Sequence, residues 1–431
     1  MLGTTSLITT TNASLASATC DLPVWSRGFA WRCCDVAPTS LGVFSPQRRL
    51  AAHTMNLGEN GDVRWATVDI PEQGIVYVPS ADFAAFVTRF QALPNSTRLT
   101  VVTGQEDCSV PRELWYGTTG VGGANEPGRY AEACAAEGAA NVRPLADDFG
   151  PLSSFLSDRR LVRWWVQNYD FEGWTPYSSG LGVEGVTAEQ LAKVQPLPIG
   201  LDLHTNSLTS PVCDQWSSLQ RVRSAAPSFA SRESRLLVSF GCAAAEMTIR
   251  YDRAAACHWL QGGDGRTSPF SADNASSHVR VLASTARDDF WHAAGEAAFV
   301  ATPQGHGMDT HRLWEVLALG AVPVVRDGAL RKLYADLPVA FVDEWSDLSD
   351  EAHVREAMAR WRANITARFG AEPFASAAVR DRLDLSWWNR RIREEHNAQL
   401  RATAESRNGR AVRGQATLVQ RLQPEPDPAA P

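Results

Sequence analysis

The strongest constraint on the fold lies in residues 301–325, which read ATPQGHGMDTHRLWEVLALGAVPVV. This order predicts the end of a buried strand, a loop containing Gly305 and Gly307, a helix that stops at Gly320, and a second apolar strand. The helix has an apolar stripe at i, i+3 and i+4, formed by Leu313, Val316 and Leu317, which is the spacing of a helix packed on a sheet. A strand, a glycine loop, a helix and another strand are the parts of a parallel α/β fold.

The same alternation extends through most of the chain. Strands are predicted at residues 74–78, 99–103, 198–203, 235–240, 279–282, 297–302, 321–325 and 339–342. Helices are predicted at residues 80–90, 160–167, 310–319, 330–334 and 351–369. Strands and helices that alternate in this way form parallel sheets covered by helices on both faces.

The length of 431 residues exceeds what one ordinary core holds, so we expect two domains. The periodic pattern weakens near residues 204–232. We therefore predict an irregular N-terminal segment at 1–60, an N-terminal Rossmann-like domain at 61–205, a C-terminal Rossmann-like domain at 206–400, and a disordered tail at 401–431. The tail prediction rests on its polar, Arg-rich and finally Pro-rich composition.

Charge and hydropathy exclude some classes of protein and leave the compartment open. The formal net charge of −7 argues against a nucleic-acid binder, and no run approaches the ~18 apolar residues of a membrane span. The eight cysteines contain no CxxC pair, which argues against a zinc or thioredoxin-like site, and they fit either disulfides or buried thiols. N-x-S/T triplets at Asn12, Asn95, Asn274 and Asn364 are compatible with a secretory lumen.

The glycine loop and the helix after it form the candidate binding site. Gly305, His306 and Gly307 allow a ligand to approach the backbone closely, and Asp309 or Thr310 caps the helix. A helix start favours an anion. Arg312 then suits a diphosphate, and Glu315, one helical turn on, suits the hydroxyls of a ribose. The alternative is a solvated Arg–Glu pair on an ordinary helix.

The run PQGHGMDTHRLWEVLALGAVPVV resembles the signature of the exostosin family of glycosyltransferases. Shorter pieces fit in the same order: TGQEDCSVP at 103–111, WWVQNYD at 164–170, PLPIGLDLHT at 196–205 and LPVAFVDEW at 337–345. The resemblance implies a GT-B fold, in which two Rossmann-like domains face each other across a cleft. It also implies inverting transfer from a nucleotide sugar bound by the C-terminal domain.

The resemblance extends to partners and compartment. It implies a UDP-sugar as the expected donor, a glycan or glycoprotein acceptor, no cofactor, and work in the Golgi or secretory lumen. Family members often have an N-terminal membrane anchor; none is visible here, which leaves peripheral membrane association open. The family run commonly has Arg and Asn where this chain has Gln304 and His306. The missing Arg puts donor affinity and identity in question.

An inverting transfer needs a general base near the acceptor hydroxyl, at the carboxyl end of a strand in the first domain. Asp107 follows the 99–103 strand, and Asp202 and His204 follow the 198–203 segment; we favour Asp107. Turn capping is the alternative role for each. No metal site is expected, because the helix start and Arg312 neutralise a diphosphate.

Some tryptophan-containing segments are assigned structural roles. Trp164 and Trp165 are expected in the core, with Gln167 and Asn168 beside them at the cleft. Trp387 and Trp388 begin a late helix expected to cross back and brace the first domain.

Two other functions compete with transfer. A non-catalytic exostosin-like protein would keep the fold and bind a glycan or a partner transferase, and Gln304 is the feature that favours it. A Rossmann oxidoreductase requires G-x-G-x-x-G after an early strand, whereas this loop lacks the third glycine and comes late in the chain.

Overall fold

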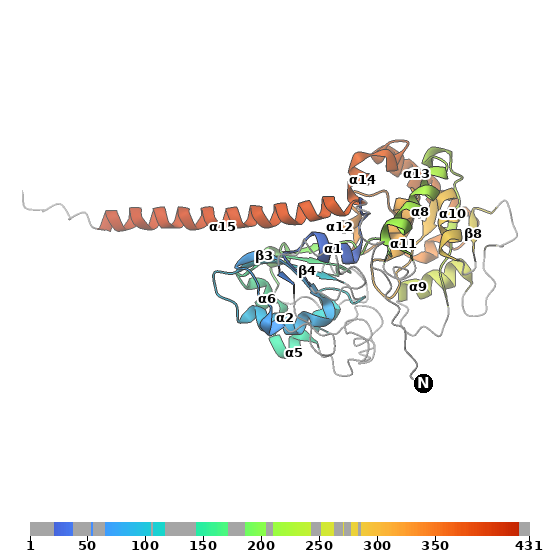
Figure 1. Ribbon diagram of the computed structural model, residues 1–431. Coiled ribbons are helices and arrows are strands. Elements are labelled where there is room, and N and C mark those ends of the chain that lie inside the picture. Colours follow the sequence, from blue (N-terminus) through green and yellow to red (C-terminus); the bar gives the residue numbers. More distant parts are fainter. Residues whose placement is uncertain are drawn as a thin grey trace, which may run out of the picture.

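The computed structural model of the chain contains two α/β domains lying side by side (Figure 1). It describes residues 21–37, 53–54, 65–104, 107–116, 144–170, 186–203, 210–242, 251–262, 270, 277–282 and 286–421. Side chains are not described at residues 31, 53–54, 251 and 406–421.

The N-terminal domain has a six-stranded sheet in the order β2-β1-β3-β4-β5-β6, in which all neighbouring strands are parallel. Helices α1 and α15 (Leu385–Arg421) lie on one face of this sheet, and α2 and α6 lie on the other (Figure 1). The strands are β1 (Val36–Ala37), β2 (His53–Thr54), β3 (Gln73–Pro79), β4 (Arg98–Gly104), β5 (Leu161–Val166) and β6 (Val194–Pro196). The helices are α1 (Ser26–Arg32), α2 (Phe83–Gln91), α3 (Arg112–Tyr116), α5 (Leu145–Phe149), α6 (Leu152–Ser157) and α7 (Ala188–Leu191).

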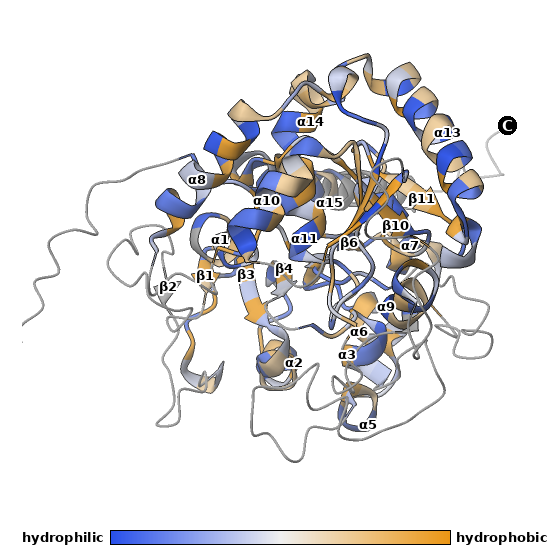
Figure 2. Cartoon of the chain, turned by 90° about the vertical axis from the view of Figure 1, so that its right-hand side faces the viewer, coloured by the Kyte–Doolittle hydropathy of each residue, from blue (hydrophilic) through white to orange (hydrophobic). Residues whose placement is uncertain are grey.

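The C-terminal domain has a five-stranded sheet in the order β11-β10-β9-β7-β8, again with parallel neighbours. Its strands are apolar, while the covering helix α13 mixes polar and apolar residues (Figure 2). The strands are β7 (Leu236–Val238), β8 (Val279–Val281), β9 (Phe299–Ala301), β10 (Val322–Arg326) and β11 (Ala340–Val342). The helices are α8 (Val212–Ala225), α9 (Tyr251–Ala256), α10 (Arg287–Glu296), α11 (His311–Ala318), α12 (Arg331–Tyr334), α13 (Glu351–Phe369) and α14 (Ala377–Arg382).

These two sheets confirm the predicted fold class, two Rossmann-like domains of the GT-B type. Each sheet is parallel, and in each the strand order reverses once, between β1 and β3 in the first domain and between β7 and β9 in the second. A reversal of this kind defines a doubly wound sheet. The predicted strands at 74–78, 99–103, 235–240, 279–282, 297–302, 321–325 and 339–342 all match observed strands within a few residues.

Aromatic packing holds the N-terminal core together. The Trp164 ring stacks on Phe83 with 4.9 Å between centroids, and Phe155 meets Trp164 edge to face at 5.5 Å. The indole nitrogen of Trp164 donates to Thr103 Oγ1 at 2.7 Å, so the buried polar atom is satisfied. Trp164 and Trp165 are both buried, as expected.

The segment 160–167 was expected to be a helix, and this prediction is wrong. It forms strand β5, which lies between β4 and β6. Leu161, Trp164 and Trp165 fit helical spacing, but a short apolar run of this kind fits a doubly buried strand equally well. Residues 198–203 were predicted to form a short strand and a loop; the strand β6 lies earlier, at Val194–Pro196, and residues 198–203 form a largely buried loop.

The predicted irregular lead-in and disordered tail also need correction. Residues 21–37 contribute α1 and β1, and they bury Trp25, Phe29 and Val36 in the first domain. These elements are too short to show periodicity in the sequence. At the other end, α15 (Leu385–Arg421) continues through the predicted tail as far as Arg421, over residues rich in Ala, Arg and Gln, which are good helix formers.

Helix α15 crosses back and braces the first domain, as predicted from Trp387 and Trp388 (Figure 1). His396 lies on its inner face, with Nδ1 3.0 Å from Thr100 Oγ1 of β4. Arg393 is paired with Asp35 at 3.2 Å. The two domains are therefore joined both by the chain near residue 203 and by this returning helix.

Among the described residues, no helix combines the length and the apolar character needed to cross a membrane.

The buried His396 makes the brace sensitive to acid. Burial lowers the pKa of His396; Asp35 opposes this shift and Arg393 adds to it. The unfolded chain therefore takes up this proton first, and stability present above pH ~6.5 is lost as the pH falls toward the lowered pKa. Between pH 7 and 5, His396→Asn should lose stability less steeply than the wild type, by at most ~1.4 kcal/mol per pH unit. Urea unfolding at several pH values measures this, and equal slopes would contradict it.

Candidate functional site

The candidate site lies at the reversal point of the C-terminal sheet. The carboxyl ends of β7 and β9 lie beside each other there, because these strands are parallel neighbours and the chain continues from them toward opposite edges of the sheet. Residues 239–242 follow β7, and residues 302–310, which we call the glycine loop, follow β9. Ligands of doubly wound sheets bind outside the carboxyl ends of the strands at such a point.

The glycine loop is tightly turned, and its backbone is held at Gln304 by hydrogen bonds to two side chains. Gly305 N–H donates to the Gly307 carbonyl at 3.1 Å. The backbone N–H of Gln304 donates to the buried Asp252 carboxylate at 2.7 Å, and the Gln304 carbonyl accepts from Arg253 Nε at 2.9 Å. Both partners lie on α9, so this helix fixes the path of the loop. The side chain of Asp252 also accepts from the Trp345 indole at 2.8 Å.

Helix α11 begins as the sequence predicts. Thr310 is the N-cap in extended conformation, and its hydroxyl accepts from Leu313 N–H at 3.4 Å. This resolves the choice between Asp309 and Thr310 as the capping residue. Leu313, Val316 and Leu317 are buried, which confirms the predicted stripe.

Arg312 lies at the reversal point. Its guanidinium donates to the Ser239 carbonyl, directly after β7, and stacks on the Phe290 ring with 4.5 Å to the centroid. Burial lowers the pKa of Arg312; Glu315 opposes this shift, while Arg253 adds to it. Because an arginine retains its charge even when buried, a positive charge is held at the carboxyl edge of the sheet.

Glu315 is paired with a different arginine from the one expected. Its Oε1 atom accepts from Arg287 at 3.0 Å. Arg287 also donates to Gln215 Oε1 at 2.9 Å and to the carbonyl of Asp202. Arg287 thus connects the first turns of α10 and α11 with the segment that leaves the first domain, and Asp202 takes part through its backbone.

Asp309 was expected to contact the donor, and the structure corrects this assignment. The residue is 2% exposed, and its carboxylate accepts from Ile199 N–H at 2.8 Å, from the Trp314 indole at 2.9 Å and from Tyr334 O–H at 2.7 Å. Burial raises its pKa, and the hydrogen bonds oppose that shift. Asp309 is therefore an internal anchor that ties the glycine loop to the first domain.

Two further hydrogen bonds hold the glycine loop and α11 against the first domain. Asn168, in left-handed conformation with φ of 52°, accepts through Oδ1 from Asp309 N–H at 2.9 Å. A Cβ atom on Gly307 would lie 2.8 Å from that Oδ1. His311 Nδ1 lies 2.7 Å from the Gly200 carbonyl. Asn168 is fully buried at this contact and does not line an open cleft.

Asp107 and His306 face each other across the two domains. Asp107 follows β4 of the first domain, and its Oδ2 lies 3.8 Å from Nδ1 of His306 in the glycine loop. Their side chains are 45% and 52% exposed, so solvent reaches the space around this pair. Among the first-domain base candidates, the structure places Asp107 next to the glycine loop. It places Asp202 beside Arg287, and His204 lies outside the described residues.

Two arginines near the glycine loop and α11, Arg253 and Arg287, were not predicted from the sequence. Arg287 could have been found, because it follows strand β8 at the carboxyl edge of the sheet, where binding residues gather. Arg253 lies in α9, for which the sequence predicted no helix, so its place at the glycine loop depends on tertiary packing. A disulfide between Cys242 and Cys257 fastens the end of this helix to the segment after β7.

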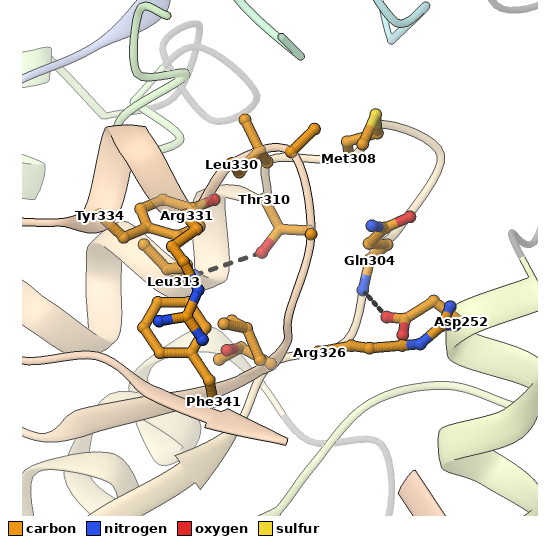
Figure 3. A pocket seen from close by; sticks show the side chains of 14 residues that line it. Asp252, Gln304, Met308, Thr310, Leu313, Arg326, Leu330, Arg331, Tyr334 and Phe341 are labelled. Carbon is orange, nitrogen blue, oxygen red and sulfur yellow. Dashed lines mark hydrogen bonds between the residues drawn. The ribbon is translucent and has the colours of Figure 1, made fainter. Parts of the chain in front are cut away.

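A pocket adjoins the glycine loop on the β10 side (Figure 3). Gln304, Thr310 and Asp252 supply polar groups at its wall, and Leu313, Leu330 and Phe341 supply apolar ones, as Figure 3 shows. Two arginines at its rim are each matched by a carboxylate: Arg326 by Glu344 at 2.8 Å, and Arg331 by Asp327.

Within the described parts of the chain, no group of three or more His, Cys, Asp or Glu side chains is placed to hold a metal ion.

Comparison with known proteins gave only distant structural similarities. No family model and no curated protein matches the chain. The α,α-trehalose 6-phosphate synthase of Burkholderia multivorans aligns over 78% of this chain and 73% of its own, at 12% identity and a TM-score of 0.35. The UDP-forming trehalose-phosphate synthase of Burkholderia xenovorans, in complex with glucose-6-phosphate, aligns over 76% and 74%, at 12% identity and a TM-score of 0.33.

An α-glucosyltransferase in complex with UDP-glucose and DNA containing an abasic site aligns over 74% of this chain and 80% of its own, at 10% identity and a TM-score of 0.31. The strand orders of the two sheets, and not these low similarities, define the fold class.

The contact between Gly307 and Asn168 leaves no room for a methyl group. Gly307→Ala should destabilise the protein by about 1–3 kcal/mol, because Asn168 must move from its bond to Asp309. Gly328→Ala is the matched control, since a Cβ there meets nothing within 4 Å. Thermal unfolding of both variants measures the difference. Equal midpoints for the two would show that the loop is not clamped at Gly307.

Proposed function

We propose that the protein is a glycosyltransferase that moves a sugar from a nucleoside diphosphate donor, preferably a UDP-sugar, to a glycan acceptor. The observation that carries this proposal is the position of Arg312. Its charge is held at the reversal point of the C-terminal sheet, beside a glycine loop that faces a solvent-accessible carboxylate, Asp107, on the other domain. A cation on one side and a base on the other are what an inverting transfer requires.

The proposed chemistry assigns one role to each side. The oxygen of the acceptor hydroxyl attacks the anomeric carbon, and its proton goes to the Asp107 carboxylate. The bond between the anomeric carbon and the diphosphate oxygen breaks, and its electron pair leaves with the diphosphate. Arg312 stabilises the negative charge that the diphosphate gains, as fixed donors do in other transfer reactions. His306, 3.8 Å from Asp107, lies where acceptor and leaving group meet.

The pocket beside the glycine loop is the proposed location of the donor sugar. Sugar rings need hydrogen-bonding groups for their hydroxyls and apolar surface for their C–H faces. Thr310, Gln304 and Asp252 provide the first, and Leu330 and Phe341 provide the second. Glu315 stays the proposed acceptor for the ribose hydroxyls, with Arg287 orienting its carboxylate.

We further propose that the protein belongs to the exostosin family, works in the Golgi or secretory lumen and associates peripherally with a membrane. We also propose that the transfer inverts the anomeric configuration and needs neither a metal nor another cofactor. The support is the signature run at residues 303–325 together with the two-domain fold.

Removing the Arg312 cation should remove nucleotide binding. UDP or GDP should raise the thermal midpoint of the wild type, and Arg312→Ala should abolish that rise, because a charge-assisted contact to phosphate is worth about 10- to 100-fold in affinity. Arg355→Ala on the exposed face of α13 is the control for loss of one positive charge. A full rise in the Arg312→Ala protein would contradict the phosphate role.

Removing the proposed base should separate binding from chemistry. Asp107→Asn keeps the size of the side chain and lowers its basicity, so we expect transfer from a radiolabelled nucleotide sugar to fall by about 100-fold or more. The UDP-induced midpoint rise should stay unchanged. Asp202→Asn is the comparison, and it should keep most activity because Asp202 meets Arg287 through its carbonyl. Undiminished transfer by Asp107→Asn would eliminate it as the base.

A screen of nucleotide sugars against glycan acceptors also tests the non-catalytic alternative. Nucleotide binding followed by no transfer or hydrolysis of any donor would favour a protein that binds glycan or a partner enzyme.

A further inference from the structure

Residues 167–170 form a buried corner directly after β5, at a point where the two domains meet. Each of these residues is at most 9% exposed. Among the described parts of the chain, Asn168 is the one non-glycine residue with a positive φ, at 52°, a conformation that few side chains besides Asn and Asp accept. Such a conformation persists only where the surrounding contacts hold it in place, so the contacts of Asn168 must account for it.

The backbone of Asn168 holds the segment that carries Asp107. The Asn168 carbonyl accepts from Val110 N–H at 3.0 Å, and the Val110 carbonyl accepts from Asp170 N–H at 2.8 Å. The Ser109 hydroxyl donates to the Asp170 carboxylate at 3.1 Å. Asp107, the proposed base, precedes Ser109 by two residues on this segment. The corner therefore fixes the backbone close to the base.

The side chain of Asn168 holds the glycine loop of the other domain. Its Oδ1 atom accepts from Asp309 N–H at 2.9 Å. The absence of a side chain at Gly307 leaves room for this contact, since a Cβ atom there would lie 2.8 Å from Oδ1. His306 precedes Gly307 on the loop, with its Nδ1 atom 3.8 Å from Asp107 Oδ2. One residue is thus bonded both to the segment of Asp107 and to the loop of His306.

Two other anchors tie the glycine loop and α11 to a different part of the first domain. Asp309 accepts from Ile199 N–H at 2.8 Å, and His311 Nδ1 lies 2.7 Å from the Gly200 carbonyl. These contacts hold the domains together without the Asn168 side chain, but they end at residues 199 and 200 and not at the segment after β4. The Asn168 link is therefore distinct from the general attachment of the two domains.

We propose that Asn168 is a positioning residue for the transfer reaction, which sets the distance between the base Asp107 and the glycine loop that borders the donor. The inference rests on the proposed function and adds to it a fully buried residue that contacts neither substrate. Attack requires the acceptor oxygen to lie about 3–3.5 Å from the anomeric carbon, while its proton lies within hydrogen-bond reach of the base. Donor and base belong to different domains, so a short buried link between them satisfies both conditions at once.

The test compares turnover with binding in Asn168→Gly. Glycine adopts a positive φ without strain, so this variant removes the side-chain link to Asp309 and keeps the backbone link to Val110. We expect kcat for transfer to fall about 10- to 100-fold, while the donor KM and the affinity for UDP or GDP, measured by isothermal titration calorimetry, change less than about threefold. Val354→Ala leaves a cavity under α13; it is the control for lowered stability and should keep its kcat.

A double variant separates the link from the packing around it. Gly307→Ala displaces the Asn168 side chain, so it should lower both the thermal midpoint and kcat. Asn168→Gly removes the atoms that a Cβ on residue 307 would meet. The protein with both substitutions should therefore unfold at a higher temperature than Gly307→Ala alone, while its kcat stays as low as that of Asn168→Gly. Recovery of kcat together with the midpoint would show that only the packing matters, and it would overturn the inference.

The outcomes separate this inference from the proposed function. An unchanged kcat in Asn168→Gly, or a fall in kcat matched by an equal fall in nucleotide affinity, overturns the inference and leaves the proposed function standing. A wild-type protein that transfers sugar from no nucleotide donor overturns the proposed function and this inference together. If Asn168→Gly does not fold, Gly307→Ala decides, since its kcat must then fall more than its affinity for UDP or GDP.

Discussion

The buried carboxylate of Asp309 is the interaction on which the geometry of the site depends. An isolated carboxylate inside a protein is costly, so it persists only where hydrogen bonds replace its water. Here the replacement comes from Ile199 of the first domain and from Trp314 and Tyr334 of the second. The last residues of the glycine loop are therefore fixed to both domains, and removing any one donor leaves part of a buried charge unsatisfied.

This anchor divides the glycine loop into two halves with different surroundings. The half at Gly307 and Asp309 is enclosed between the domains, where Asn168 leaves no space for a side chain. The half at Gln304 to His306 is held from one side by α9 and faces Asp107 on the other. Preorganised donors act best when they do not move during the reaction, and a loop held at both ends meets that condition.

The sequence predicted the fold well where its periodicity was strong and long. The strands on either side of α11 and the helix itself were found because the apolar stripe, the cap and the closing Gly320 all agree. Residues 160–167 failed because two adjacent tryptophans fit helix and strand alike, and only the neighbouring strands β4 and β6 decide between them. Lead-in residues such as Val36 were not predicted, because a two-residue strand is too short to show a period.

The sequence predicted only those parts of the site whose residues lie close together along the chain. Gly305, Gly307 and Arg312 lie within a few residues of a recognisable helix start, and the structure keeps them at the carboxyl edge of the sheet. Asp309 was misassigned because two of the three side-chain and backbone donors named above, Ile199 and Tyr334, are 110 and 25 residues away, and no local spacing reveals that its carboxylate points inward. Arg253 was missed for the same reason, since it reaches the loop from 51 residues upstream. An overall charge of −7 also hides the local positive charge of Arg312, because the field at the edge of the sheet is set by the nearest few groups and not by the sum over the surface.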